Sequence, residues 1–256
     1  MARIKFLNTE IDNLTFNEAL SEIDNIIAQR KPNSLRFEGK PLKPAYLVTP
    51  NMDHLAILEE NEQFRETYKH ADLILADGKP MIWISKLKGT PIKEKVSGSD
   101  LFPQICELSA HRGYTIFLLG GMENVLEKAI HKLVQKHLKI KIVGVFSPKF
   151  GFENNPVEIK QIIDQVRKAS PDILAIFLGA PKQEIFIYKY KDELNVPISL
   201  CLGAAIDFAA GTRKRAPHWM QICGLEWLFR LWIEPRRLYK RYLRDFIYLF
   251  KLYFKY

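Results

Sequence analysis

Five short segments of this chain contain glycine, or polar residues of the kinds that bind phosphate and move protons, or both. Each segment follows an apolar run: Thr49-Pro50-Asn51, Asp77-Gly78, Gly120-Gly121, Gly179-Ala180-Pro181-Lys182-Gln183 and Gly203-Ala204-Ala205-Ile206-Asp207. Glycine lets the backbone approach a ligand closely, and free N–H groups at a helix N-terminus bind phosphate. The carboxylate of Asp77 can exchange a proton with a ligand or cap the helix that follows it. Together the segments predict a site for a phosphorylated ligand.

The elements that must position these segments alternate between apolar runs and longer helical patterns. Strands are predicted at residues 46–49, 73–76, 115–119, 142–146, 173–178 and 198–202, and helices at 55–68, 101–112, 125–137, 157–168 and 182–190. Several strands are continuous apolar runs, which is typical of strands buried on both faces of a parallel sheet. The alternation predicts an α/β fold with a doubly wound, mostly parallel sheet. Ligands of such folds bind beyond the carboxyl ends of the strands, where the five segments lie.

The first 44 residues are less regular, and they predict a strand at 4–6, a helix at 16–29 and a loop at 31–44. Residues 2–13 are charged and polar, unlike the apolar part of a signal peptide, so export is not expected. Cys106, Cys201 and Cys223 have no metal-ligand spacing. We expect them to be reduced thiols of a cytosolic protein.

Several motifs are absent from the sequence, and their absence narrows the chemistry. It contains no G-x-G-x-x-G after a strand, no Walker motif and no G-x-S-x-G, so a classical dinucleotide enzyme or a P-loop NTPase is poorly supported. It also lacks the Asp-x-Asp with which many nucleotide-sugar enzymes hold a divalent cation. We therefore expect neither a cofactor nor a metal. Lysine, arginine and backbone N–H groups must then neutralise any diphosphate.

The last 44 residues carry nearly all of the net charge. They contain eleven Lys or Arg and three acidic residues, so +8 of the formal +9 lies there, together with three of the four tryptophans. On a helical wheel from residue 236, the apolar face is formed by Tyr239, Tyr242, Leu243, Phe246, Phe250, Tyr253 and Phe254. The opposite face is formed by Arg237, Lys240, Arg241, Arg244, Lys251 and Lys255.

Such a helix predicts contact with an anionic membrane surface, with the apolar side down and the cations on lipid phosphates. Its apolar runs are too short to cross a bilayer, which takes about 20 residues. The alternative is a helix that packs on the core and has a solvated basic back. Nucleic acid is another polyanion that such a region can bind, but no signature of a nucleic-acid-binding fold is present, and we expect no such partner.

The strand-end segments and the region after them resemble the WecG/TagA/CpsF family of bacterial glycosyltransferases. The resemblance runs from about residue 47 to residue 242 and rests on segments 48–51, 76–80, 95–100, 118–121, 179–184, 203–217, 224–227 and 234–237. Each segment alone is a weak match, whereas their combination in this order is specific.

The resemblance implies a Rossmann-like core at residues 1–210 and a C-terminal helical appendage at 211–256 that closes the active site and contacts the membrane. It implies inverting transfer of a sugar from a UDP-sugar to a sugar on a polyprenyl diphosphate, for a bacterial surface polysaccharide or cell-wall polymer. The UDP-sugar is the donor substrate, no metal is required, and the protein is peripheral on the cytoplasmic face of the inner membrane. The donor sugar is not implied, and a homo-oligomer is left open.

The resemblance also assigns roles at the strand ends. It implies that Asp77 is the general base and that Thr49 and Asn51 hold the donor sugar or orient the base, although both also suit turns and caps. Gln183 would contact a sugar hydroxyl or the nucleotide, unless it is simply solvated. Asp207 would bind uracil or ribose, with helix capping as the alternative.

Arg230, Arg237 and Lys240 match the positions of the tail that in the family would reach the diphosphate. Lys95, Gly120 and Gly121 are further candidates for substrate binding. Arg237 is the best candidate for stabilising the leaving group, and surface solvation is the alternative for Lys240. Lys95 departs from the family, which commonly has arginine there, so a point charge replaces a bidentate donor.

Two other functions remain open at the level of sequence. One is a non-catalytic protein that binds a nucleotide-sugar or a lipid phosphate and uses its tail as an anchor. The other is an oxidoreductase with an atypical NAD(P)-binding loop.

Overall fold

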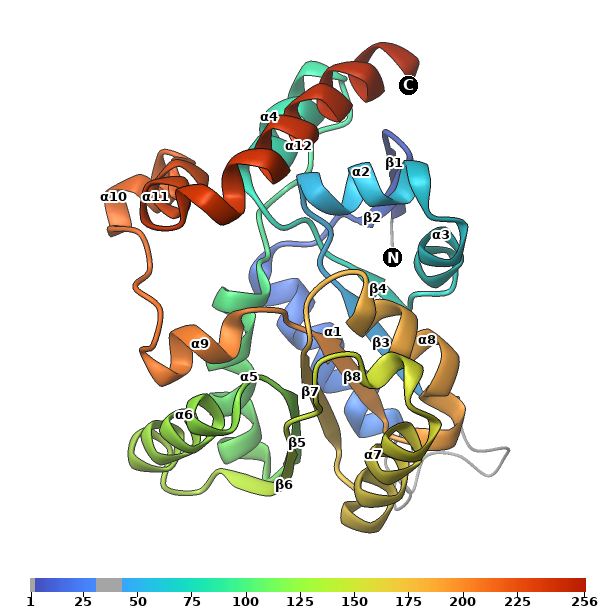
Figure 1. Ribbon diagram of the computed structural model, residues 1–256, viewed down its shortest axis with the longest axis vertical. Coiled ribbons are helices and arrows are strands. Elements are labelled where there is room, and N and C mark those ends of the chain that lie inside the picture. Colours follow the sequence, from blue (N-terminus) through green and yellow to red (C-terminus); the bar gives the residue numbers. More distant parts are fainter. Residues whose placement is uncertain (1–2, 31–42) are drawn as a thin grey trace.

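A parallel sheet forms the centre of the protein. The computed structural model describes residues 3–30 and 43–256. The strands lie in the order β4 (Leu73–Ile74), β3 (Ala45–Val48), β8 (Ile198–Cys201), β7 (Ile173–Phe177), β5 (Thr115–Gly120) and β6 (Lys141–Phe146). All neighbouring pairs are parallel, so their carboxyl ends lie at the same edge of the sheet (Figure 1). The predicted α/β class with a parallel sheet is confirmed.

Helices cover both faces of this sheet and enclose two hydrophobic cores. Successive strand residues point to opposite faces, and accordingly Tyr46 packs in one core and Leu47 in the other. The first core includes residues of α2 (Met52–Glu60), α3 (Glu62–Lys69), α4 (Lys79–Leu87), α7 (Pro156–Ala169) and α8 (Lys182–Leu194). The second includes residues of α1 (Phe16–Arg30), α5 (Gly98–Arg112), α6 (Glu123–Lys136) and α9 (Ala205–Ala210). Burial on both sides explains why the strand sequences are continuously apolar.

The predicted helix at 55–68 is wrong as a single element, because Asn61 divides it. The Asn61 N–H donates to the Ile57 carbonyl at 2.9 Å and ends α2, while its side chain accepts from the Phe64 N–H at 2.9 Å and starts α3. Asparagine is among the best residues at such a helix start. The prediction also omitted α4 and α9, which are short.

The N-terminal region differs slightly from the prediction. The expected strand at 4–6 is one half of an antiparallel hairpin formed by β1 (Arg3–Phe6) and β2 (Thr9–Asp12). Asp12 joins this hairpin to the sheet by accepting from the Ile74 N–H at 2.8 Å. Of the predicted loop at 31–44, all but the last two residues lie outside the described residues. A short 3-10 helix, η1 (Phe152–Asn154), precedes α7.

The basic C-terminal region forms α10 (His218–Ile222), α11 (Glu226–Ile233) and α12 (Pro235–Lys255). α12 lies along α2, and Leu252 is buried in the first core (Figure 1). Asp53 of α2 accepts hydrogen bonds or ion pairs from Arg241 at 2.9 Å and from Arg244. Near the end of α12, Lys255 pairs with Glu59 at 2.8 Å. The helix is therefore attached to the sheet domain through α2.

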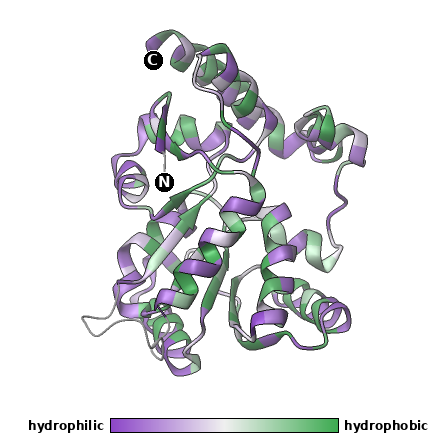
Figure 2. Cartoon of the chain, turned by 180° about the vertical axis from the view of Figure 1, so that it is seen from behind, coloured by the Kyte–Doolittle hydropathy of each residue, from purple (hydrophilic) through white to green (hydrophobic). Residues whose placement is uncertain are grey.

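This attachment corrects the predicted division of α12 into two faces. Arg241, Arg244 and Lys255, which the helical wheel placed with the lipid-facing cations, contact α2 instead. The outward residues of α12 include Tyr239, Lys240, Leu243, Phe246, Phe250, Lys251 and Phe254. Figure 2 accordingly shows both hydrophobic and hydrophilic colour along α12. Within residues 3–30 and 43–256, no helix combines the length and apolar character that a membrane crossing requires.

Candidate active site

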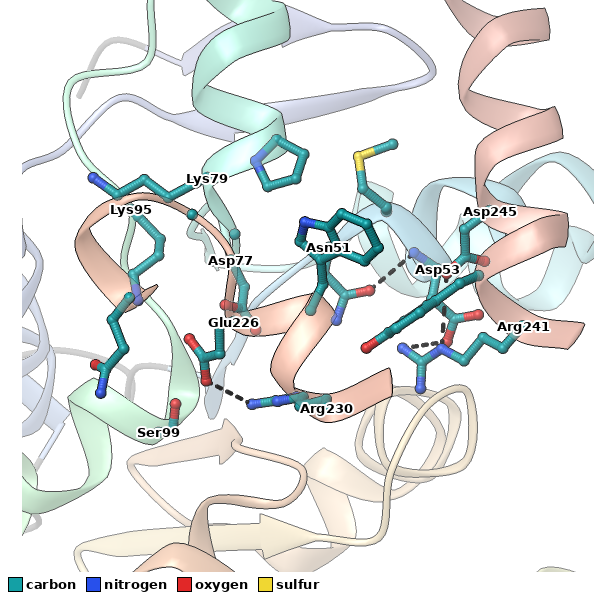
Figure 3. A pocket seen from close by; sticks show the side chains of 17 residues that line it. Asn51, Asp53, Asp77, Lys79, Lys95, Ser99, Glu226, Arg230, Arg241 and Asp245 are labelled. Atoms are coloured by element: carbon teal, nitrogen blue, oxygen red, sulfur yellow. Dashed lines mark hydrogen bonds and ion pairs between the residues drawn. The ribbon is translucent and has the colours of Figure 1, made fainter. Parts of the chain in front are cut away.

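Two cavities meet at Asp77, at the carboxyl edge of the sheet. The strand-end cavity, of about 420 Å³, is lined mainly by residues that follow β3, β7 and β8. The appendage cavity, of about 130 Å³, lies between the core and α10–α12 (Figure 3). Six residues line both cavities: Asn51, Asp53, Asp77, Ser99, Arg230 and Arg241. A group transferred from one cavity to the other would pass these shared residues.

Backbone hydrogen bonds fix Asp77 and the residue before it, just after the short strand β4. Its N–H donates to the Pro50 carbonyl at 2.8 Å, and the preceding carbonyl of Ala76 accepts from the Val96 N–H at 2.8 Å. Gly78 follows with φ +117°, a conformation that favours glycine, and occupies the start of α4. Because Gly78 takes the capping position, the Asp77 carboxylate is left free to face the cavities.

The surroundings of Asp77 make it a stronger base than an ordinary aspartate. Desolvation raises its pKa to about 6, against the opposing positive charges of Lys95 and Arg230. The negative charges of Glu226 and Asp100 add to the upward shift. A carboxylate with this pKa is still mostly ionised at pH 7 and accepts a proton more readily than one at the usual value near 4.

Thr49 and Asn51 lie beside Asp77, as predicted, and both also have structural contacts. The Thr49 hydroxyl is buried and donates to the Cys201 carbonyl at 3.4 Å, which joins the ends of β3 and β8. Asn51 caps α2 by accepting from the N–H groups of Asp53 at 3.0 Å and His54 at 3.3 Å. Its Nδ2 group makes no hydrogen bond among the residues that the structure describes, and is a donor for the cavity.

Gln183 lines the strand-end cavity, but its polar atoms are used internally. Its Oε1 accepts from the Gly203 N–H at 3.1 Å, and its Nε2 donates to Glu184 at 2.7 Å. With 3% of its surface exposed, it is not the solvated residue of the alternative prediction. It aligns the loops after β7 and β8 with each other. Asp207 also lines this cavity, from the first turn of α9.

Gly120 and Gly121 line neither of the two cavities. A Cβ atom at Gly120 would lie 2.8 Å from the carbonyl of Phe177, so glycine is needed there for contact between β5 and β7. Gly121 has φ +81°, and its carbonyl accepts from the Ser147 hydroxyl at 2.6 Å. The structure thus gives both glycines a packing role and brings neither to Asp77.

Lys95 lines the appendage cavity and is paired with Asp100 at 2.7 Å. Burial opposes ionisation of Asp100, but hydrogen bonds from Lys95 and Ser97 prevail and lower its pKa to about 2. The lysine ammonium is therefore held beside Asp77 by a permanently charged partner. A compact ammonium suits this single strong contact.

Two of the three predicted appendage cations reach the cavities. Arg230 lines both of them and stacks over the Phe208 ring at 5.4 Å, while Arg237 lines the strand-end cavity. Lys240 is exposed on α12 and lines neither cavity, so the structure does not bring it to the other predicted residues.

Sequence reasoning missed six charged residues that line the cavities: Asp53, Lys79, Arg213, Glu226, Arg241 and Asp245. Arg213 belongs to a basic run that was visible in the sequence as part of the matching segment 203–217. Arg241 had been placed among the lipid-facing cations. Asp53 had no feature that set it apart, because its partners come from residues far along the chain.

These cavities and the parallel sheet define an α/β protein with a strand-end site lined by cationic side chains and closed on one side by C-terminal helices. The family model described as "Glycosyl transferase WecG/TagA/CpsF family" matches residues 4–256, and the chain belongs to this family. The predicted family is confirmed, and with it a glycosyltransferase.

Three relatives carry the same description, N-acetylglucosaminyldiphosphoundecaprenol N-acetyl-beta-D-mannosaminyltransferase. The protein of Bacillus spizizenii is 29% identical over 195 residues, which are 76% of this chain and 74% of the relative. That of Bacillus subtilis is 29% identical over 191 residues, or 74% and 71% of the two chains. That of Staphylococcus aureus (strain NCTC 8325 / PS 47) is 23% identical over 237 residues, or 93% and 87%.

Proposed function

We propose that this protein transfers a sugar, with inversion, from a UDP-sugar to a sugar carried on a polyprenyl diphosphate. The observation that carries the proposal is the position of Asp77, a carboxylate of raised pKa where the two cavities meet. The names of the relatives suggest the pair of substrates to test first. These are UDP-N-acetylmannosamine as donor and N-acetylglucosaminyl-diphosphoundecaprenol as acceptor.

The donor fits the strand-end cavity. Its walls carry four arginines, Arg213, Arg230, Arg237 and Arg241, and side chains of this kind suit the charge of a diphosphate. Asp207, in the same wall, is a hydrogen-bond acceptor of the kind that binds ribose or uracil. A nucleotide bound there would direct its sugar towards Asp77.

The acceptor fits the appendage cavity. This cavity combines charged groups with the apolar surfaces of Met52, Pro80, Trp227 and Tyr242. Aromatic and aliphatic faces of this kind stack on sugar rings and on isoprenyl carbon. Asn51 and Ser99 line both cavities and provide hydrogen bonds next to the carboxylate.

In the proposed step, an acceptor hydroxyl oxygen attacks C1 of the donor sugar and passes its proton to the Asp77 carboxylate. The bond from C1 to the phosphate oxygen breaks, and its electron pair leaves on the β-phosphate of UDP. Arg230 and Arg237 stabilise that growing negative charge. Attack from the face opposite the leaving group inverts C1, so an α-linked donor gives a β-linked product.

Metal independence is part of the proposal, because six cationic side chains line the two cavities. They are Lys79, Lys95, Arg213, Arg230, Arg237 and Arg241. Fixed cations of this number can supply the charge that a divalent ion supplies elsewhere.

We also propose that the outer surface of the C-terminal helices rests on the cytoplasmic face of the membrane, where the lipid-linked acceptor is available. Large apolar residues are exposed on α10, α11 and α12, among them Trp219, Trp232, Phe246 and Phe250. The exposed cations Arg236, Lys240 and Lys251 border this surface on α12 and can attract anionic lipid.

The test is a transfer assay with UDP-N-acetylmannosamine and an N-acetylglucosaminyl-diphospho-lipid of short, water-soluble chain, in excess EDTA. We expect one UDP released per disaccharide formed, with a β linkage by NMR. An α linkage would contradict inversion, and activity that needs added Mg²⁺ or Mn²⁺ would contradict metal independence. If UDP binds but no UDP-N-acetylhexosamine is turned over, the chain is a binding protein instead.

A further inference from the structure

The seven residues 211–217 that join α9 to α10 contain two arginines, and each bridges an acid of the core to an acid of the C-terminal helices. Arg215 pairs with Asp100 of α5 and, at 3.9 Å, with Glu226 of α11. Arg213 pairs with Asp207 of α9 at 3.7 Å and with Glu234 at 3.3 Å. Lys214 lies between the two arginines and is exposed.

The two acids of the C-terminal helices, Glu226 and Glu234, also pair with Arg230 and Arg237. We call Arg230 and Arg237 the cavity arginines, and Arg213 and Arg215 the linker arginines. Glu226 accepts from Arg230 at 3.0 Å, and Glu234 accepts from Arg237. The result is two ion-pair chains of the same order: core acid, linker arginine, appendage acid, cavity arginine. The first ion-pair chain is Asp100–Arg215–Glu226–Arg230, and the second is Asp207–Arg213–Glu234–Arg237.

We propose that Arg213 and Arg215 are positioning residues that set Arg237 and Arg230, respectively, over the nucleotide diphosphate. This inference rests on the proposed function, which assigns the diphosphate to the two cavity arginines. A free arginine side chain loses rotamer entropy when it is fixed on a ligand. When a carboxylate already holds the guanidinium group, part of this entropy is lost before the ligand binds. Ligand binding then costs less conformational entropy.

Arg215 is the clearer case, because it lines neither cavity and has no direct route to a ligand. Its side chain is 27% exposed, and those of Asp100 and Glu226 are 28% and 20% exposed. Ion pairs that are this accessible to water contribute little to the stability of the fold. Removal of Arg215 is therefore expected to displace Arg230 while the fold stays intact.

The experiment measures the affinity for UDP, by calorimetry, and the rate of sugar transfer. The variants are Arg213→Ala, Arg215→Ala, Arg230→Ala, Arg237→Ala and the four double variants that pair a linker arginine with a cavity arginine. Lys214→Ala is the matched control, since it removes one positive charge from the same linker and breaks no ion pair among the described residues. Arg215→Lys and Arg213→Lys test whether a shorter cation restores function.

We expect each linker variant to weaken UDP binding about 10-fold, and each cavity variant to slow transfer by about 10². Within one ion-pair chain the double variant should lose less than the product of the two single losses, because the linker arginine acts through its cavity arginine. For Arg215, which lines neither cavity, the double variant should resemble Arg230→Ala alone. Across the chains, as in Arg215→Ala with Arg237→Ala, the effects should multiply. The lysine variants should recover part of the loss, and Lys214→Ala should match the wild type.

Two outcomes overturn the inference. The first is that the two single effects multiply in a double variant within one ion-pair chain as fully as they do across the two ion-pair chains. The linker arginines would then act on their own or on the fold as a whole. If Lys214→Ala weakens UDP binding as much as Arg215→Ala, only the charge of the linker matters. A wild-type protein that binds no UDP would instead contradict the proposed function. The melting temperature of every variant identifies losses that come from unfolding.

Discussion

Arg230, from the C-terminal helices, lines the same two cavities as Asp77 of the core, and its charge lowers the pKa that burial raises at Asp77. In Figure 3 a dashed line joins Arg230 to Glu226, whose negative charge acts on Asp77 in the opposite direction. The pKa of the proposed base is therefore adjusted by a residue that reaches the core only because α11 is folded against it. Removal of α11 would change both the proposed leaving-group contacts and the pKa of Asp77.

Replacing Asp77 with Asn should remove most turnover and leave UDP binding nearly unchanged. General base catalysis is worth about 10²–10⁴-fold, and the amide keeps the shape of the carboxyl group without its basicity. Single-turnover kinetics and calorimetry measure the two quantities. Asp192→Asn, at an exposed position on α8, is the matched control. Turnover within a few-fold of wild type would remove Asp77 from the role of base.

The same variant should also be more stable at high pH. A carboxyl group whose pKa is higher in the folded than in the unfolded chain costs stability once the pH exceeds its unfolded pKa of about 3.9. Asp77 is partly exposed and has a pKa of about 6. At pH 8 we therefore expect Asp77→Asn to raise the free energy of unfolding by about 1–2 kcal/mol. Urea denaturation at pH 8 and pH 4 measures it, and the gain should disappear at the lower pH.

Transfer should decline as the pH falls through about 6, where Asp77 takes up a proton. Lys95→Met removes a positive charge that favours the carboxylate, so its acidic limb should move to higher pH. Glu226→Gln removes a negative charge that disfavours the carboxylate, so its limb should move to lower pH. Profiles of kcat against pH measure both shifts. If the acidic limbs of the pH profiles coincide in the wild type, Lys95→Met and Glu226→Gln, the titrating group is not Asp77.

The contact between α12 and α2 should depend on Asp53. Asp53→Asn leaves Arg241 and Arg244 without their main partner, next to Asp245, whose own pKa is raised to about 6 by burial and by Asp53. We expect the free energy of unfolding to fall by about 1–3 kcal/mol and α12 to be cleaved faster by proteases. Breaking an interior ion pair costs more than breaking a surface pair. Glu62→Gln, an exposed acid on α3, is the control. Equal protection of α12 in both variants would contradict this anchoring role.

Binding to anionic vesicles should depend on the outward aromatic residues of α12. The double variant Phe246→Ser and Phe250→Ser should bind at least about 10²-fold more weakly, because a buried phenylalanine side chain contributes about 1.5–3 kcal/mol. The matched control is Leu138→Ser with Phe150→Ser, which removes exposed apolar side chains outside the C-terminal helices. Sedimentation with vesicles measures the difference, and equal loss in both variants would argue against this surface.

Local sequence was sufficient to predict the sheet and the residues at its edge. Strand ends are marked by apolar runs followed by glycine or polar residues, so Thr49, Asn51 and Asp77 were recognised before their contacts were known. The sequence also indicated that the C-terminal region forms an amphipathic helix. These features depend on residues that are neighbours in the chain.

What the sequence did not predict depends on partners that are distant in the chain. A helical wheel has no information about α2, so it could not separate Arg241 and Arg244, which pair with Asp53, from the outward Lys240 and Lys251. Gln183 was expected at a ligand, whereas it bridges two loops through Gly203 and Glu184. The break at Asn61 is an exception, because its partners Ile57 and Phe64 are neighbours in the chain, and the prediction of one helix at 55–68 left this local capping signal out.

The buried and the exposed residues of α12 lie on different sides of the helix. Leu238, Asp245 and Leu252 face the protein, while Leu243, Phe246 and Phe250 face outward. Mutation can therefore alter the outer side without disturbing the contact between α12 and α2. During evolution, descendants of this protein in cells with different lipids can exchange outward side chains freely. The inner side and the active site it supports would meanwhile stay under a separate constraint.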